Sequence, residues 1–127
     1  MSEEKVGVFL GKWTIGAPMP GAKLVHLQVI VDVVNKRITG TATLTQAVNP
    51  PLDHPFQVSG LYHDVAIAGG FAHAFSLRTP VTPLLGAPSI EIIGDFASDW
   101  QKGVATVHYA IGSSFGSLVD APIAVVK

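Results

Sequence analysis

The sequence predicts an all-β protein, an antiparallel β-sandwich or barrel of about eight strands. Apolar and polar residues alternate with period two along most of the chain, and β-branched residues are frequent. Glycines and prolines separate these stretches at short intervals, and no stretch carries apolar residues at helical spacing between helix caps. Many short strands between turn residues are typical of both architectures, so the pattern leaves sandwich and barrel open.

The strand pattern recurs in eight segments of the chain. In order, they are Val6–Ile15, Leu24–Val34, Ile38–Gln46, Phe56–Ala68, Phe71–Thr79, Ser89–Phe96, Val104–Ile111 and Leu118–Val126. The second and third segments are the best defined, because each has an apolar face and a polar one, the latter a row of threonines at 39, 41, 43 and 45. With Asn35-Lys36 as a two-residue loop, Val33 opposes Ile38, Val29 opposes Ala42 and Leu27 opposes Leu44, and the two apolar faces coincide.

The other connections follow from turn residues. Gly69-Gly70 predicts a second hairpin and Ser98–Gly103 a third, whereas prolines mark longer connections at Pro50–Pro55 and Pro80–Pro88. Pro122 lies within the last segment, and because proline cannot donate to a sheet ladder, that strand is expected at an edge or with a bulge.

Length and composition limit the classes of function. The 127 residues suit a single all-β domain, residues 1–127, and the absence of cysteine excludes disulfides and thiolate chemistry. A net charge of −1 with scattered lysines and arginines argues against a nucleic-acid partner. The sequence shows neither an apolar signal segment nor about eighteen consecutive apolar residues, so we expect a cytoplasmic protein with no membrane partner.

The low content of charged residues predicts self-association. Only 13% of the residues are charged while 48% are hydrophobic, and a soluble monomer normally covers its surface with charge. Unprotected edge strands pair with other chains, and the visible edge guards are few: Pro122, Lys5 and Lys12. We therefore expect a homo-oligomer, most simply a two-fold dimer, with a compact monomer as the alternative.

Residues with catalytic potential occur, but not in the patterns that catalysis requires. Gly112-Ser113-Ser114-Phe115-Gly116 matches G-x-S-x-G with Ser114 as the nucleophile, yet that motif needs a strand-to-helix turn in a large α/β sheet. No two acidic residues have the spacing of a glycosidase pair. We expect no catalytic residues and no cofactor.

Five histidines lack the close spacing of metal ligands. They are His26, His54, His63, His73 and His108. His73 shares a face with Phe71, Phe75 and Leu77, and pairing across Gly69-Gly70 places Asp64 diagonally from it, as a partner for a half-buried imidazole. A core histidine with satisfied hydrogen bonds, and no metal site, is the expectation.

Two motifs point toward known families. Gly11-Lys12-Trp13 is similar to the G-x-W of lipocalin- and avidin-like barrels, in which the tryptophan closes one barrel end. The stretch T-Q-A-V-N-P-P-L at 45–52, together with 94–96 and 99–103, resembles a family of small bacterial proteins known only as a domain of unknown function. That resemblance covers residues 24–126 and implies an all-β fold without an assigned activity.

Three functions remain open from the sequence. The favoured one is a non-enzymatic interaction or self-assembly module. The second is a small-molecule carrier whose apolar pocket is lined by Trp13 and phenylalanines, and the third is a small hydrolase that uses Ser114 or a histidine.

Overall fold

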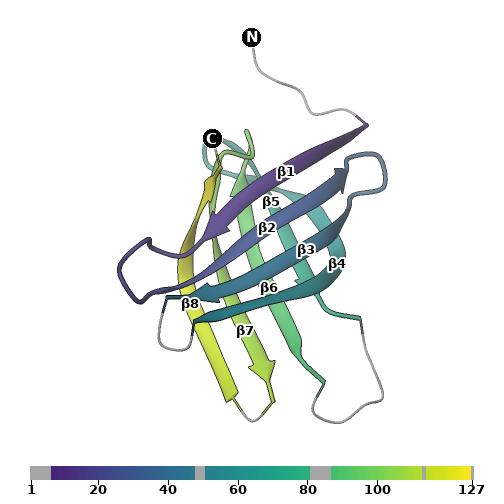
Figure 1. Cartoon of the computed structure of the whole chain (residues 1–127). Helices are drawn as coiled ribbons and strands as arrows, with labels where there is room; N and C mark the ends of the chain where they lie inside the picture. The colour runs from purple at the N-terminus through teal and green to yellow at the C-terminus, as the bar shows by residue number, and fades with distance from the viewer. Residues whose placement is uncertain (1–6, 48–50, 81–86, 113, 127) are drawn as a thin grey trace.

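The chain forms a closed antiparallel β-barrel in which the strands follow one another in sequence order (Figure 1). A computed structural model describes residues 7–47, 51–80, 87–112 and 114–126. The strands are β1 (Val8–Ile15), β2 (Lys23–Asp32), β3 (Arg37–Gln46), β4 (Leu52–Ile67), β5 (Gly70–Arg78), β6 (Ser89–Ala97), β7 (Lys102–Ile111) and β8 (Ser114–Val125). The all-β prediction is confirmed, and of its two architectures the barrel is the one adopted.

The register of the β2–β3 hairpin differs from the prediction by two residues. Val31, not Val33, lies opposite Ile38, and Leu27 lies opposite Ala42. The predicted loop Asn35-Lys36 is wrong, because residues 33–36 together form the turn. The carboxylate of Asp32 accepts hydrogen bonds from the backbone and side-chain amides of Asn35, at 3.0 and 2.9 Å, and these bonds close the longer turn. A shift of two residues keeps each side chain on its face, so the threonine row still faces outward.

Large apolar side chains fill the barrel interior. Trp13, Ile15, Phe96, Leu77 and Ile92 are among the fully buried residues, and Leu27 is also buried. The buried group contains no polar or charged residue among the part of the chain that the structure describes. The interior is therefore a packed core, as in other small eight-stranded barrels whose lumen is just wide enough for side chains.

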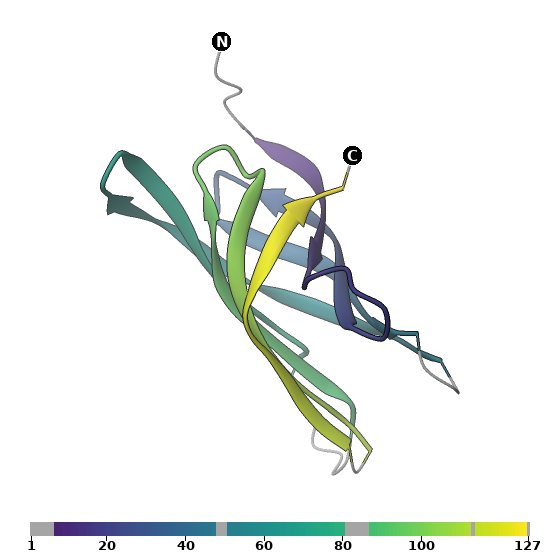
Figure 2. The same cartoon turned by 90° about the vertical axis from the view of Figure 1, so that its left-hand side faces the viewer.

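The other hairpins agree with the turn residues, with small displacements. The β4–β5 loop is Ala68-Gly69, since Ile67 pairs with Gly70, and residues 98–101 connect β6 and β7. Figure 2 shows the β4–β5 hairpin projecting from one end of the barrel and the β7–β8 hairpin from the other. Pro122 lies in β8, which carries a register irregularity opposite Thr106, as its proline predicted.

The barrel closes through a short seam. β1 pairs with β2 over its whole length but with β8 only from Trp13 to Ile15. The first half of β1, from Val8 to Lys12, therefore has one sheet neighbour instead of two. Among the described residues, no helix is long and apolar enough to cross a membrane.

Candidate functional site

One end of the barrel is closed by two tryptophans, and the first of them comes from β1. The side chain of Trp13 is 2% exposed and packs at a centroid distance of 4.5 Å against Phe96. Gly11 makes room for it, because a Cβ at this position would overlap the Trp13 ring. The G-x-W motif thus places a tryptophan at a barrel end, as its similarity to other barrels implied.

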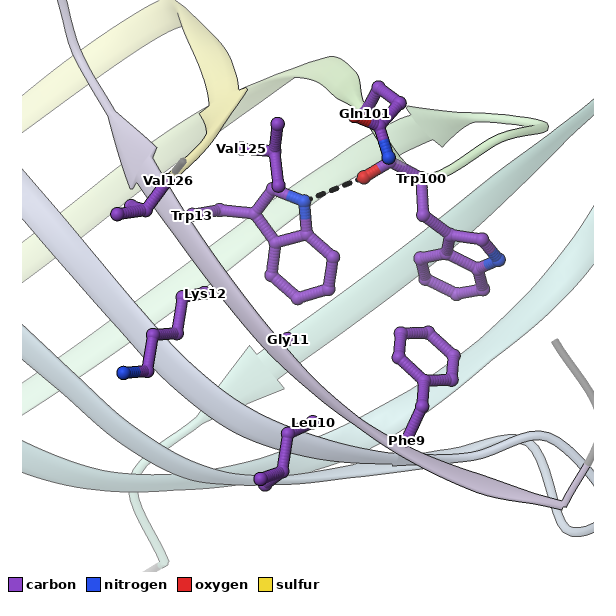
Figure 3. A pocket seen from close by; sticks show the side chains of 9 residues that line it. All are labelled: Phe9, Leu10, Gly11, Lys12, Trp13, Trp100, Gln101, Val125 and Val126. Carbon is purple, nitrogen blue, oxygen red and sulfur yellow. Dashed lines mark hydrogen bonds between the residues drawn. The ribbon is translucent and has the colours of Figure 1, made fainter. Parts of the chain in front are cut away.

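The second tryptophan, Trp100, comes from the turn between β6 and β7. Its φ of 63° lies in the left-handed region, which is costly for a bulky residue. This backbone conformation accompanies a side chain folded back over the barrel end, where it is only 5% exposed. The carbonyl of Trp100 accepts a buried 2.7 Å hydrogen bond from Nε1 of Trp13, so the two tryptophans fix each other (Figure 3).

A histidine stacks on the other side of Trp100. The rings of His73 and Trp100 are 4.0 Å apart and nearly parallel, at 11°. Tyr62 meets both rings edge-on, at 5.8 Å from His73 and 5.1 Å from Trp100. His73 comes from β5 and Tyr62 from β4, so three strands and one turn contribute to this aromatic cluster.

Both ring nitrogens of His73 have partners. Nδ1 lies 2.7 Å from Oδ1 of Asp64, and Nε2 lies 3.1 Å from the carbonyl oxygen of Ser98. Because both oxygens accept, both contacts are hydrogen bonds only when each ring nitrogen carries a hydrogen. The expectation of a satisfied histidine paired with Asp64 is confirmed, although Asp64 lies directly opposite His73 and not diagonally.

Asp64 connects this histidine to a lysine at the rim. Lys36 donates to Oδ2 of Asp64 at 3.2 Å, and its ammonium lies 5.1 Å from the centroid of the Tyr62 ring. Burial acts to raise the pKa of the Asp64 carboxyl, but the hydrogen bonds and positive charges of His73 and Lys36 outweigh it and hold the pKa below its usual value. Burial raises the pKa of the Tyr62 hydroxyl, and the nearby carboxylates of Asp64 and Asp32 act in the same direction.

A groove of about 270 Å³ opens beside this cluster (Figure 3). It lies between the first half of β1, the Trp100–Gln101 turn and the end of β8. The lining residues are Phe9, Leu10, Gly11, Lys12, Trp13, Trp100, Gln101, Val125 and Val126. In Figure 3, Phe9, Trp13 and Trp100 converge on one side of β1, and Leu10 and Lys12 extend on the other.

The structure does not bring the remaining histidines together. His26, His63 and His108 are exposed, and His54 stacks on Phe56 at the inner side of β4. No group of three histidine, aspartate or glutamate side chains that could hold a metal ion occurs among the described residues. His54 keeps one buried nitrogen, Nδ1, without a hydrogen-bond partner.

The G-x-S-x-G segment forms a hairpin. Ser114 is exposed and starts β8 opposite Ile111, with β-strands on both sides of the turn. Ser113 lies outside the described residues. The segment therefore lacks the strand-to-helix geometry that a nucleophile elbow requires.

Sequence reasoning identified Trp13 but not Trp100. The residue lies in a predicted turn, Ser98–Gly103, where side chains are ordinarily exposed, and no local pattern indicates that it folds inward. The signal that could have raised the question is a tryptophan in a turn of a chain with only two tryptophans.

Comparison with protein families gives one match. Residues 6–115 match the family model described as a domain of unknown function, DUF1842. The match starts upstream of the stretch 24–126 that carried the resemblance and ends before it, and it includes β1 and the Trp100 turn. No curated protein matches the chain.

Proposed function

The chain belongs to the DUF1842 family, and we propose that it is a non-enzymatic interaction module that self-associates through the free edge of β1. The observation that carries this proposal is the unpaired first half of β1 in a barrel that is otherwise closed. A strand with unpaired amides and carbonyls is a template for another strand.

The backbone of Leu10 faces the gap. The carbonyl of Lys12 points toward β8, where it accepts a 2.9 Å hydrogen bond from the amide of Val126. Because backbone groups alternate sides along a strand, the amide and carbonyl of Leu10 point to the same side. Within the described ranges, neither group pairs with another strand, so Leu10 offers one donor and one acceptor to an incoming strand.

An apolar surface adjoins this edge. Val8 is 63% exposed and Leu10 75%, and Ile30, which lies directly opposite Leu10 on β2, is also exposed. Contiguous exposed apolar residues are typical of interaction surfaces. A second copy of this chain supplies the same edge and the same apolar residues, so an isologous two-fold contact would satisfy both.

Light scattering coupled to size exclusion tests the proposal. We expect a mass of twice the 13.3 kDa monomer for the wild type. Val8→Lys should give the monomer, because a lysine beside a free edge disfavours strand pairing. Val119→Lys is the matched control, since Val119 is 68% exposed and lies on β8 in the projecting hairpin, and it should remain a dimer.

Two outcomes would contradict the proposal. A wild-type protein that elutes at the monomer mass at micromolar concentration and moderate salt would show that the edge does not pair. A Val8→Lys variant that stays dimeric would place the interface elsewhere.

A further inference from the structure

We propose that the groove beside Trp13 binds a small planar aromatic carboxylate. The site is separate from the self-association proposed above, because Val8 and Ile30 do not line the groove. Three properties of the groove define the ligand: its size, its aromatic walls and its single charge.

The size of the groove limits the ligand to a small molecule. A volume of about 270 Å³ is close to the lower limit of ligand pockets, about 300 Å³. Such a volume fits one or two fused rings and a short polar group. The barrel interior offers no comparable room, because buried side chains fill it.

The walls are aromatic and held in place. The Trp13 and Trp100 rings are 6.2 Å apart at their centroids, and Phe9 meets Trp100 edge-on at 5.4 Å. The hydrogen bond from the Trp13 indole to the Trp100 carbonyl is already made in the free protein. Since these rings need little ordering on binding, the groove is preorganised for a flat apolar group.

The only charged residue in the lining is a lysine. The Lys12 side chain is exposed at the groove rim, forms no ion pair with the described residues, and no acidic residue contributes to the lining. The free amide of Leu10 is a second donor on the same strand. Aromatic faces also attract cations, but the ammonium of Lys12 would repel one, so the charge favours an anion.

Titration with 2-naphthoate, followed by tryptophan fluorescence, tests the site. We expect saturable binding that weakens as salt increases, because the contact with Lys12 is solvent-exposed. Lys12→Gln should weaken binding about ten-fold, the effect of one charge-assisted hydrogen bond. Lys23→Gln is the control, since Lys23 stacks over Tyr109, which lies outside the groove, and it should bind as the wild type does.

A second ligand and a second variant separate the possible failures. The neutral 2-naphthamide, of similar shape, should bind more weakly than 2-naphthoate. Val8→Lys should keep the affinity of the wild type, which shows that binding does not depend on self-association. Both indole N–H signals in an NMR spectrum should shift on binding, because the chain has only two tryptophans and both line the groove.

Three results would overturn the proposal. Fluorescence that does not saturate up to millimolar 2-naphthoate would exclude the site. Equal affinity of the wild type and Lys12→Gln would exclude the charge contact, and equal affinity for the acid and the amide would exclude a preference for a carboxylate.

Discussion

At the scale of single residues, the barrel end shows how a polar pair is accommodated beside a hydrophobic core. The His73 side chain is 13% exposed and stacks on Trp100, so its nitrogens have little access to water. Asp64 and the Ser98 carbonyl take the place of water as hydrogen-bond partners. Because the ring has no nitrogen left over, this histidine holds the Trp100 turn against β5 and is poorly placed to act as a base.

Asp64→Asn should lower the stability of the protein in a pH-dependent manner. The pKa of the Asp64 carboxyl is lowered in the folded protein, so its ionised form stabilises the fold. That contribution is present above the unfolded pKa, about 3.9, and is lost as the pH falls through the folded pKa. Urea midpoints should therefore differ between wild type and variant near pH 7 and converge below about pH 4.

The convergence at low pH is the critical observation. Asparagine keeps the size of the side chain and cannot ionise, so a packing defect alone would produce a difference that does not change with pH. A constant difference down to about pH 2.5 would show that the charge of Asp64 contributes nothing.

At the scale of elements, the sequence determined faces more reliably than registers. The alternation in β2 and β3 placed Leu27, Val29 and Ala42 inside, and all three are buried. Period two cannot distinguish registers that differ by two residues, so the choice fell to the turn. Its length depends on the Asp32–Asn35 hydrogen bonds and on the left-handed backbone of Lys36, φ 54°, which the dipeptide Asn35-Lys36 alone does not reveal.

The same limit applies to the β6–β7 turn and therefore to the candidate site. The sequence placed the turn correctly, but the inward position of Trp100 depends on contacts with Phe9, Trp13, Tyr62 and His73, which come from distant parts of the chain. The His73–Asp64 pair could be predicted because both residues belong to one hairpin. The groove could not, because its walls come from β1, a turn and the end of β8.

Trp100→Gly should be more stable than Trp100→Ala. Both variants lose the buried indole, at a cost of about 3–5 kcal/mol. Alanine retains the left-handed backbone penalty of about 1–2 kcal/mol, whereas glycine adopts a φ of 63° freely. Alanine normally exceeds glycine in stability, since glycine makes the unfolded chain more flexible. Chemical denaturation of the two variants measures the difference, and the ordinary order, alanine above glycine, would show that the turn relaxes once the indole is removed.

At the scale of the whole molecule, closure of the barrel was the feature that the sequence left open. β1 and β8 are the first and last strands, so their pairing has no turn of its own and leaves no local pattern. Sandwich and barrel share the same strands and the same hairpins, and they differ in what happens between these two strands. The structure closes them through three residue pairs, against ten in the β2–β3 ladder.

This inequality predicts that the seam opens before the rest of the barrel. The amides of Gly16 and Val126 donate across the seam, to Pro122 at 2.9 Å and to Lys12 at 2.9 Å. Local opening that separates β1 from β8 breaks these bonds while the longer ladders persist, so both amides should exchange with solvent faster than those of Val29 and Val31. Native-state hydrogen exchange measures this directly, and low denaturant should leave the exchange of Gly16 almost unchanged, since a local opening exposes little surface. If Gly16 instead exchanges as slowly as Val29 and with the same denaturant dependence, the seam opens only with global unfolding, and the three pairs with the packed Trp13 close the barrel as firmly as a full ladder.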